Sequence, residues 1–202
     1  MRKPLILLGI MALTVGLFAG CGTPDVVTNT IIVDKNGKVT EALVEDFDKD
    51  YYSAEELEAF VEAEIADYEA DHESGAVKMS GLTVEAGTAK MVMKYADAAA
   101  YRDFHKANFY VGTVVDAQSA GYKFDVMFAE VTEGTAGAAT VSGDVVMAAE
   151  GNVLVIQDYI DVQVPGTITY VSEGVTVTGS GSASIQAVNE TDVAPVAYVV
   201  YK

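Results

Sequence analysis

The stretch that decides the fold is residues 77–95, with the sequence VKMSGLTVEAGTAKMVMKY. Two runs rich in β-forming residues, Val77–Glu85 and Thr88–Tyr95, stand on either side of Ala86-Gly87, and glycine supplies the positive φ angle that a tight turn needs. In the second run every other residue is apolar, which gives the strand one buried face: Ala89, Met91, Met93 and Tyr95. The stretch therefore predicts an antiparallel β-hairpin.

A second hairpin is predicted upstream of the first. Residues 30–33 and 38–44 are rich in β-forming side chains, and they flank the sequence DKNG at 34–37. Asn36-Gly37 is a favoured pair for a tight turn, because both residues tolerate positive φ.

A helix is predicted after each hairpin. Ser53 and Glu56 have the spacing of a capping box. Apolar residues then recur at helical spacing as far as about Asp71, before Gly75, at Leu57, Phe60, Val61, Ile65 and Tyr68. Asp97 is suited to cap a shorter helix, ending near Asn108, that carries Tyr101, Phe104 and His105.

From residue 134 onward the pattern changes to short strands. Turn signals recur at Glu150-Gly151-Asn152, Pro165-Gly166, Glu173-Gly174 and Gly179-Ser180-Gly181, which predicts an antiparallel meander. Residues 153–156 are apolar on both faces and predict a central strand, and residues 196–201 predict a closing strand. The fold class is α+β, with two helices packed on antiparallel β-hairpins, followed by a β-rich antiparallel C-terminal half. Regions 30–133 and 134–202 form either one domain or two.

The first twenty residues have the three regions of an export signal. Arg2 and Lys3 give a basic start, residues 5–19 form an uncharged apolar run, and the small pair Ala19-Gly20 directly precedes Cys21. The apolar run is shorter than the ~20 residues that a helix needs to cross a bilayer. A signal at 1–20 is therefore the preferred interpretation over a permanent transmembrane anchor, with a tether at 21–29.

Residues 18–21, FAGC, resemble the lipobox of bacterial lipoproteins, with Phe18 where leucine is usual. The resemblance implies cleavage after Gly20 and transfer of diacylglycerol to the sulfur of Cys21. Cys21 is the only cysteine of the chain, so lipidation also accounts for an unpaired thiol in an exported protein. The alternative is an ordinary signal peptide with a chance cysteine. Lipidation predicts a lipid anchor on the outer, extracytoplasmic face of the cell membrane.

The formal net charge is −18, and loss of Arg2 and Lys3 leaves 10 basic against 30 acidic residues, or −20. This charge repels phosphate backbones, so nucleic acid is excluded as a partner. Cationic partners are favoured electrostatically, although an acidic surface also serves solubility alone. Half of the residues are hydrophobic, which is enough for a real core.

Asp46, Asp48 and Asp50 stand at alternate positions, as at the start of an EF-hand calcium loop. Tyr51 replaces the glycine of that loop and Leu57 replaces its glutamate. These residues are therefore a candidate calcium site of another type, and the alternative is a charged linker before a helix.

No other motif indicates catalysis. His72 and His105 are predicted to be surface or helix-end residues, no nucleophile elbow is present, and Gly179-Ser180-Gly181-Ser182 is interpreted as a turn and not as a phosphate cradle. Seven of the eleven tyrosines lie in region 30–133, where such rings either line a ligand groove or straddle the core edge: Tyr51, Tyr52, Tyr68, Tyr95, Tyr101, Tyr110 and Tyr122.

Several segments together resemble a family of uncharacterised lipoproteins of clostridial Gram-positive gut bacteria. They are Cys21, residues 31–40 (IIVDKNGKVT), residues 44–52 (VEDFDKDYY), Glu55-Glu56-Leu57, residues 95–104 and Val111-Gly112-Thr113. The resemblance implies a surface-anchored envelope protein, and Cys21 is the one functional residue that it transfers.

The predicted function is a non-enzymatic, membrane-anchored envelope or protein-interaction module, without a cofactor, that contacts an envelope protein or wall component through its acidic face. The alternative is a ligand-binding module for a cation or small nutrient. Carboxylate-based enzymatic chemistry is a third hypothesis, which no motif supports.

Overall fold

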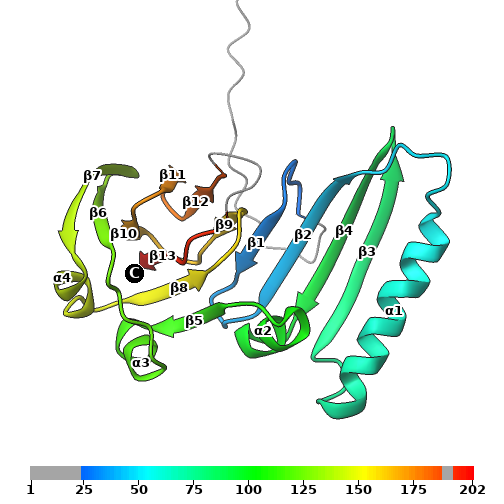
Figure 1. Ribbon diagram of the computed structural model, residues 1–202, viewed down its shortest axis with the longest axis horizontal. Coiled ribbons are helices and arrows are strands. Elements are labelled where there is room, and N and C mark those ends of the chain that lie inside the picture. The colour runs from blue at the N-terminus through cyan, green and yellow to red at the C-terminus, as the bar shows by residue number, and fades with distance from the viewer. Residues whose placement is uncertain (1–23, 188–192) are drawn as a thin grey trace, which may run out of the picture.

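The computed structural model describes residues 24–187 and 193–202, and these ranges contain thirteen strands and four helices (Figure 1). The strands form two sheets, so the α+β prediction is confirmed. Gly20 and Cys21 lie outside the described residues, and the lipidation prediction stays a prediction. Within the described ranges no helix is both long and apolar enough to cross a bilayer.

The seven-stranded sheet has the order β11-β12-β9-β1-β2-β4-β3. Its strands are β1 (Thr30–Val33), β2 (Val39–Asp46), β3 (Val77–Glu85), β4 (Thr88–Tyr95), β9 (Asp161–Gln163), β11 (Val175–Gly179) and β12 (Ser182–Ile185). Both predicted hairpins are present, and β3 and β4 have the predicted bounds. In β3 the register shifts between Met79 and Gly81, which leaves Ser80 as the extra residue of a β-bulge.

The six-stranded sheet has the order β5-β8-β13-β10-β6-β7. Its strands are β5 (Phe109–Thr113), β6 (Met127–Thr132), β7 (Thr135–Ser142), β8 (Asn152–Ile156), β10 (Ile168–Ser172) and β13 (Ala197–Tyr201). The predicted strands at 153–156 and 196–201 are confirmed as β8 and β13, and both are paired on two sides.

The prediction of one meander in the second half is wrong. Strands β8, β10 and β13 join the six-stranded sheet, whereas β9, β11 and β12 join the other sheet. In addition, β9 pairs with β1 in parallel, with Ile31 opposite Val162. Turn signals mark where strands end but not which sheet receives them, so the sequence pattern could not show this exchange.

The main core lies between the two sheets and draws on both halves of the chain. It combines Ile31, Val39 and Tyr95 from the first half with Leu154 and Val199 from the second, all nearly inaccessible. A second core covers the opposite face of the six-stranded sheet. There Val153, Val155 and Val200 pack with α3 (Val114–Ser119) and α4 (Gly143–Met147), two short helices that the sequence analysis did not predict.

The two predicted helices lie at different places on the sheets. Helix α1 (Ala54–Asp71) lies along β3 at the edge of the seven-stranded sheet, and α2 (Ala98–His105) lies next to β5 and also contacts β3 and β4 (Figure 1). Ser53 caps α1 by accepting a hydrogen bond from the Glu56 amide, but its own hydroxyl donates to Glu55, so the reciprocal half of the predicted capping box is not seen. Asp97 caps α2 as predicted.

Phe60 does not belong to the buried face of α1, contrary to the sequence analysis. Its side chain is 62% exposed, whereas Leu57, Val61, Ile65 and Tyr68 pack on the core. At about 100° per residue, Phe60 lies roughly 90° from the centre of the stripe that these four residues form.

Candidate functional site

A groove with a volume of about 1100 Å³ opens on the outer face of the seven-stranded sheet, the face directed away from the main core. The alternation of side chains defines this face. Val39, Tyr95, Val162 and Ala183 belong to the main core, so their strand neighbours point to the other side.

One row of outward residues forms the floor of the groove and crosses six neighbouring strands. Each residue of the row is the register partner of the next, in the order Ser182, Gln163, Ile32, Thr40, Lys94 and Lys78. Neighbouring strands lie about 4.8 Å apart, so the five steps span ~24 Å. The floor is therefore long enough for an extended ligand or for several small groups side by side.

Four lysines line this groove: Lys38, Lys78, Lys94 and Lys202. They are four of the ten basic residues that follow Arg2 and Lys3 in a chain of formal charge −18. Each is exposed, and among the described residues none is ion-paired with a carboxylate. Lys78 and Lys94 stand directly opposite each other, and like charges in that position disfavour the strand pair. An anion bound between them would offset this repulsion.

Asp34 is the single acidic residue that the described lining contains. Its Oδ1 accepts hydrogen bonds from the amides of Asn36, at 2.7 Å, and Lys38, at 3.0 Å. The carboxylate is therefore engaged in the β1–β2 turn as an Asx turn. The side-chain charge of the groove is positive, opposite in sign to the chain as a whole.

One wall of the groove is made of closely packed backbone. The Val164 amide donates to the Gly181 carbonyl at 2.9 Å, and a Cβ on Gly181 would lie 2.7 Å from the Gly166 carbonyl oxygen. Glycine is therefore required for this close approach. The sequence interpretation of residues 179–182 as a turn agrees with their place between β11 and β12, and the turn borders the groove.

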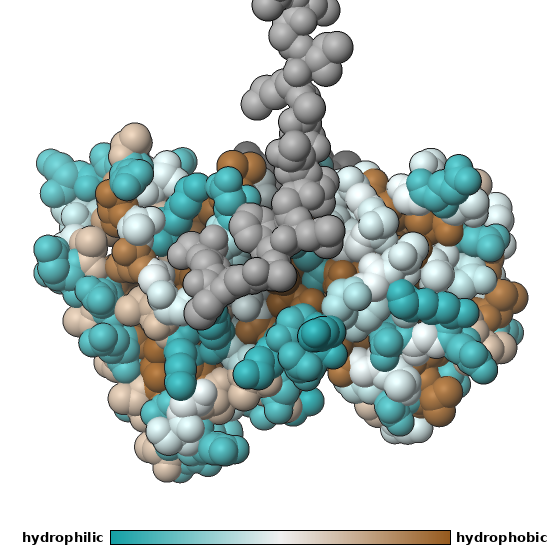
Figure 2. Space-filling model, turned by 180° about the vertical axis from the view of Figure 1, so that it is seen from behind, coloured by the Kyte–Doolittle hydropathy of each residue, from teal (hydrophilic) through white to brown (hydrophobic). Residues whose placement is uncertain are grey.

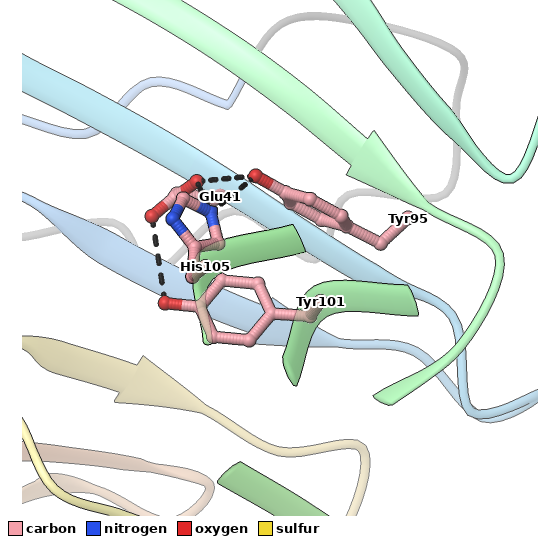
Figure 3. A network of polar contacts seen from close by, with 4 residues as sticks. All are labelled: Glu41, Tyr95, Tyr101 and His105. Atoms are coloured by element: carbon pink, nitrogen blue, oxygen red, sulfur yellow. Dashed lines mark hydrogen bonds and ion pairs between the residues drawn. The ribbon is translucent and has the colours of Figure 1, made fainter. Parts of the chain in front are cut away.

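A polar cluster lies on the opposite face of β2, centred on Glu41 (Figure 3). Glu41 is 4% exposed. Its Oε2 accepts a hydrogen bond from the Tyr95 hydroxyl at 2.7 Å and lies 3.1 Å from His105 Nε2, while the Tyr101 hydroxyl is 3.5 Å from Oε1. His105 Nε2 is also 2.7 Å from the Tyr95 hydroxyl oxygen. The cluster connects β2, β4 and α2.

The two tyrosines of this cluster hold their protons strongly. Burial raises the pKa of Tyr95 and Tyr101 well above the ordinary value of 10, and the negative charge of Glu41 raises it further. Both hydroxyls are therefore hydrogen-bond donors to Glu41 at neutral pH. Because its polar groups are directed at one another, the cluster is suited to fix α2 on the sheet.

The three aspartates predicted as a calcium site do not assemble into one. Asp46 ends β2, and the Asp48 carboxylate forms an ion pair with Lys49 at 2.7 Å. Across residues 24–187 and 193–202, no group of three or more His, Cys, Asp or Glu side chains is placed to hold a metal ion. The calcium candidate at Asp46, Asp48 and Asp50 therefore gains no support from the described geometry and stays a prediction.

The two histidines differ in their surroundings. His72 follows α1 and stacks on Tyr68 with ring centroids 3.9 Å apart, so it is an exposed helix-end residue as predicted. His105 is also at a helix end, but its imidazole contacts the buried Glu41, which the sequence analysis missed. Glu41 gave no signal, because a single glutamate on a strand looks like any solvent-facing residue.

The seven tyrosines of region 30–133 do not form a common groove. Tyr51 and Tyr52 are exposed, Tyr95 and Tyr101 are buried in the main core, and Tyr110 and Tyr122 pack against the second core. Of the seven, Tyr95 alone borders the described lysine groove. The core-edge interpretation describes them better than the ligand-lining one.

The chain was compared with known proteins at three levels. It matches no family model, no curated protein and no solved structure. The groove and the sequence of the first 21 residues are therefore the two features that bear on function.

Proposed function

We propose that this chain is a membrane-anchored, extracytoplasmic lipoprotein whose folded part is a non-enzymatic binding module for an anionic ligand, held in the lysine-lined groove. The observation that carries the binding proposal is the convergence of Lys38, Lys78, Lys94 and Lys202 on one groove in a strongly acidic chain. The anchor and the location are supported by the export-signal pattern and by the FAGC sequence at 18–21.

The groove supports an anionic ligand better than a cationic one. Lysine ammonium groups are compact, flexible point charges that bind phosphate and carboxylate groups. In the view from behind, hydrophilic side chains are interspersed with hydrophobic ones across the visible face (Figure 2).

Thermal melting tests this function. The protein is the mature chain, residues 21–202 with Cys21→Ala, which contains every described strand and helix. The probe is inorganic tripolyphosphate, compared with sodium chloride at equal ionic strength. At a probe concentration 100 times Kd, binding to the folded state adds about 2.7 kcal/mol. For a domain of this size that corresponds to a rise in Tm of about 5–11 °C.

A matched pair of double variants assigns the effect to the groove. Lys78→Gln with Lys94→Gln removes two groove charges, and Lys49→Gln with Lys123→Gln removes two charges elsewhere. We expect the first variant to lose most of the rise and the second to keep it. An equal response of both variants, or no rise beyond that in sodium chloride, would refute the proposed site.

A further inference from the structure

We infer that the lysine-lined groove is a docking site for the phosphate headgroups of anionic phospholipids in the same bilayer that holds the anchor. This inference rests on the proposed function, because it needs both a lipid on Cys21 and a groove that accepts anions. It adds the identity of the ligand and the orientation of the protein on the membrane.

The chain between the proposed anchor and the groove is short. Pro24 is part of the groove lining, and Cys21 is three residues earlier. Consecutive Cα atoms are 3.8 Å apart, so the Cα atoms of these two residues lie within about 11 Å of each other in any conformation. A lipid on Cys21 therefore places the edge of the groove next to the headgroups.

The chain after Pro24 is fastened to the sheet by side-chain hydrogen bonds. Lys90 Nζ donates to the Val26 carbonyl at 3.2 Å, and Thr28 Oγ1 donates to Asp161 Oδ2 at 2.7 Å. The Asn29 side chain donates to Glu45 and accepts from the Val44 amide. The described part of the predicted tether is thus attached to the domain, which limits how far the domain can turn away from its anchor.

The charge distribution of the protein also favours one orientation on the membrane. A chain with 30 acidic residues is repelled by an anionic membrane surface over most of its orientations. The groove is the exception, since four lysines line it and the carboxylate of Asp34 is engaged in a turn. Lysines close to an anionic membrane surface each strengthen the association about fivefold. The short anchor and the charge distribution therefore favour the same orientation, with the groove toward the headgroups.

The experiment uses the full lipidated protein reconstituted in phosphatidylcholine vesicles with or without added phosphatidylglycerol. A thiol-reactive fluorophore is placed on Thr40→Cys, in the groove floor, or on Ser119→Cys, exposed on α3 at the other side of the six-stranded sheet. Lipidation blocks the sulfur of Cys21, so each variant has one free thiol. Quenching by a lipid with a nitroxide on its headgroup reports which site is near the membrane surface.

We expect stronger quenching at position 40 than at position 119 when phosphatidylglycerol is present. Lys78→Gln with Lys94→Gln should lower the ratio of headgroup-bound to unbound orientations about 25-fold, at about fivefold per lysine. Lys49→Gln with Lys123→Gln should leave it unchanged. Equal quenching at the two positions would overturn the inference, and so would preferential quenching at position 40 that persists in the groove variant.

The outcomes separate this inference from the proposed function. If tripolyphosphate still raises Tm in the groove-dependent way but position 40 is not preferentially quenched, the groove binds a soluble anion and the lipid inference is wrong. If the tripolyphosphate effect is also absent, the binding function itself is wrong. If the protein purified from membranes carries no lipid on Cys21, the anchor is refuted and the lipid inference falls with it.

Discussion

Removal of one hydroxyl, by Tyr95→Phe, should destabilise the protein substantially at neutral pH. The Tyr95 hydroxyl makes the shortest hydrogen bond to the buried Glu41, at 2.7 Å, and it also contacts His105. A hydrogen bond to a charged group contributes about 1.5–3 kcal/mol, and a buried group that loses its partner keeps its desolvation cost. We therefore expect a loss of about 2 kcal/mol in the free energy of unfolding.

Tyr101→Phe is the matched comparison. Its hydroxyl is 3.5 Å from Glu41, at the limit of a hydrogen bond, so its removal should cost only about 0.5 kcal/mol. Urea unfolding followed by circular dichroism gives both free energies, and the Tm of Tyr95→Phe should fall by about 4–8 °C. If Tyr101→Phe costs as much as Tyr95→Phe, or if Tyr95→Phe leaves stability unchanged, the assignment of Tyr95 as the main donor is wrong.

Above pH 10 the free energy of unfolding should fall with increasing pH, because the unfolded tyrosines lose protons while Tyr95 and Tyr101, with raised pKa values in the folded state, keep theirs. Each of these two tyrosines lowers the free energy of unfolding by about 1.4 kcal/mol per pH unit. The urea midpoint should therefore fall as the pH rises from 9 upward. Tyr95→Phe should make this fall less steep, and the exposed Tyr51→Phe should leave it unchanged. Leu154→Ala and Val153→Ala truncate side chains of β8 in the two different cores, and each should lower stability, Leu154→Ala by about 2–5 kcal/mol. Each variant should still unfold in a single transition, with the same midpoint in near- and far-ultraviolet circular dichroism. Two separate unfolding transitions would show that the cores unfold independently. Finally, Cys21→Ala should move the protein from the membrane to the soluble fraction of disrupted cells, and an unchanged distribution would contradict lipid anchoring.

Individual strands and turns were predictable where a short sequence pattern is enough to specify them. The β3–β4 hairpin was predicted with its observed bounds, because a two-residue turn and one alternating strand fix such an element locally. Strand β8 was likewise recognisable as an internal strand, since residues 153–156 are apolar on both faces and both faces are buried. Long-range pairing was not predictable, and the parallel contact between β1 and β9 joins residues about 130 positions apart.

The lysine groove was missed for a specific structural reason. The β3–β4 hairpin begins at its two-residue turn with Glu85 opposite Thr88. If the pairing continued from there without a bulge, Lys78 would lie opposite Tyr95, on the buried face of the sheet. The bulge at Ser80 shifts the register by one residue, so that Lys78 pairs with Lys94 on the outer face. Gly81 is a weak sign of such a bulge. The contributions of Lys38 and Lys202 depend on tertiary structure and have no local signal.

The position of β13 also determines when this protein can acquire its structure. The last strand of the described chain is inserted between β8 and β10, and β1 in the other sheet obtains its second neighbour only from β9. The seven-stranded sheet cannot be completed before β12, which ends at Ile185, and the six-stranded sheet cannot be completed before β13, which ends at Tyr201. Such distant pairings make folding slow, because ordering a long loop precedes the contacts that stabilise it. If the chain is exported as we propose, it would stay unfolded, in the form that an export channel can thread, until most of it has crossed the membrane.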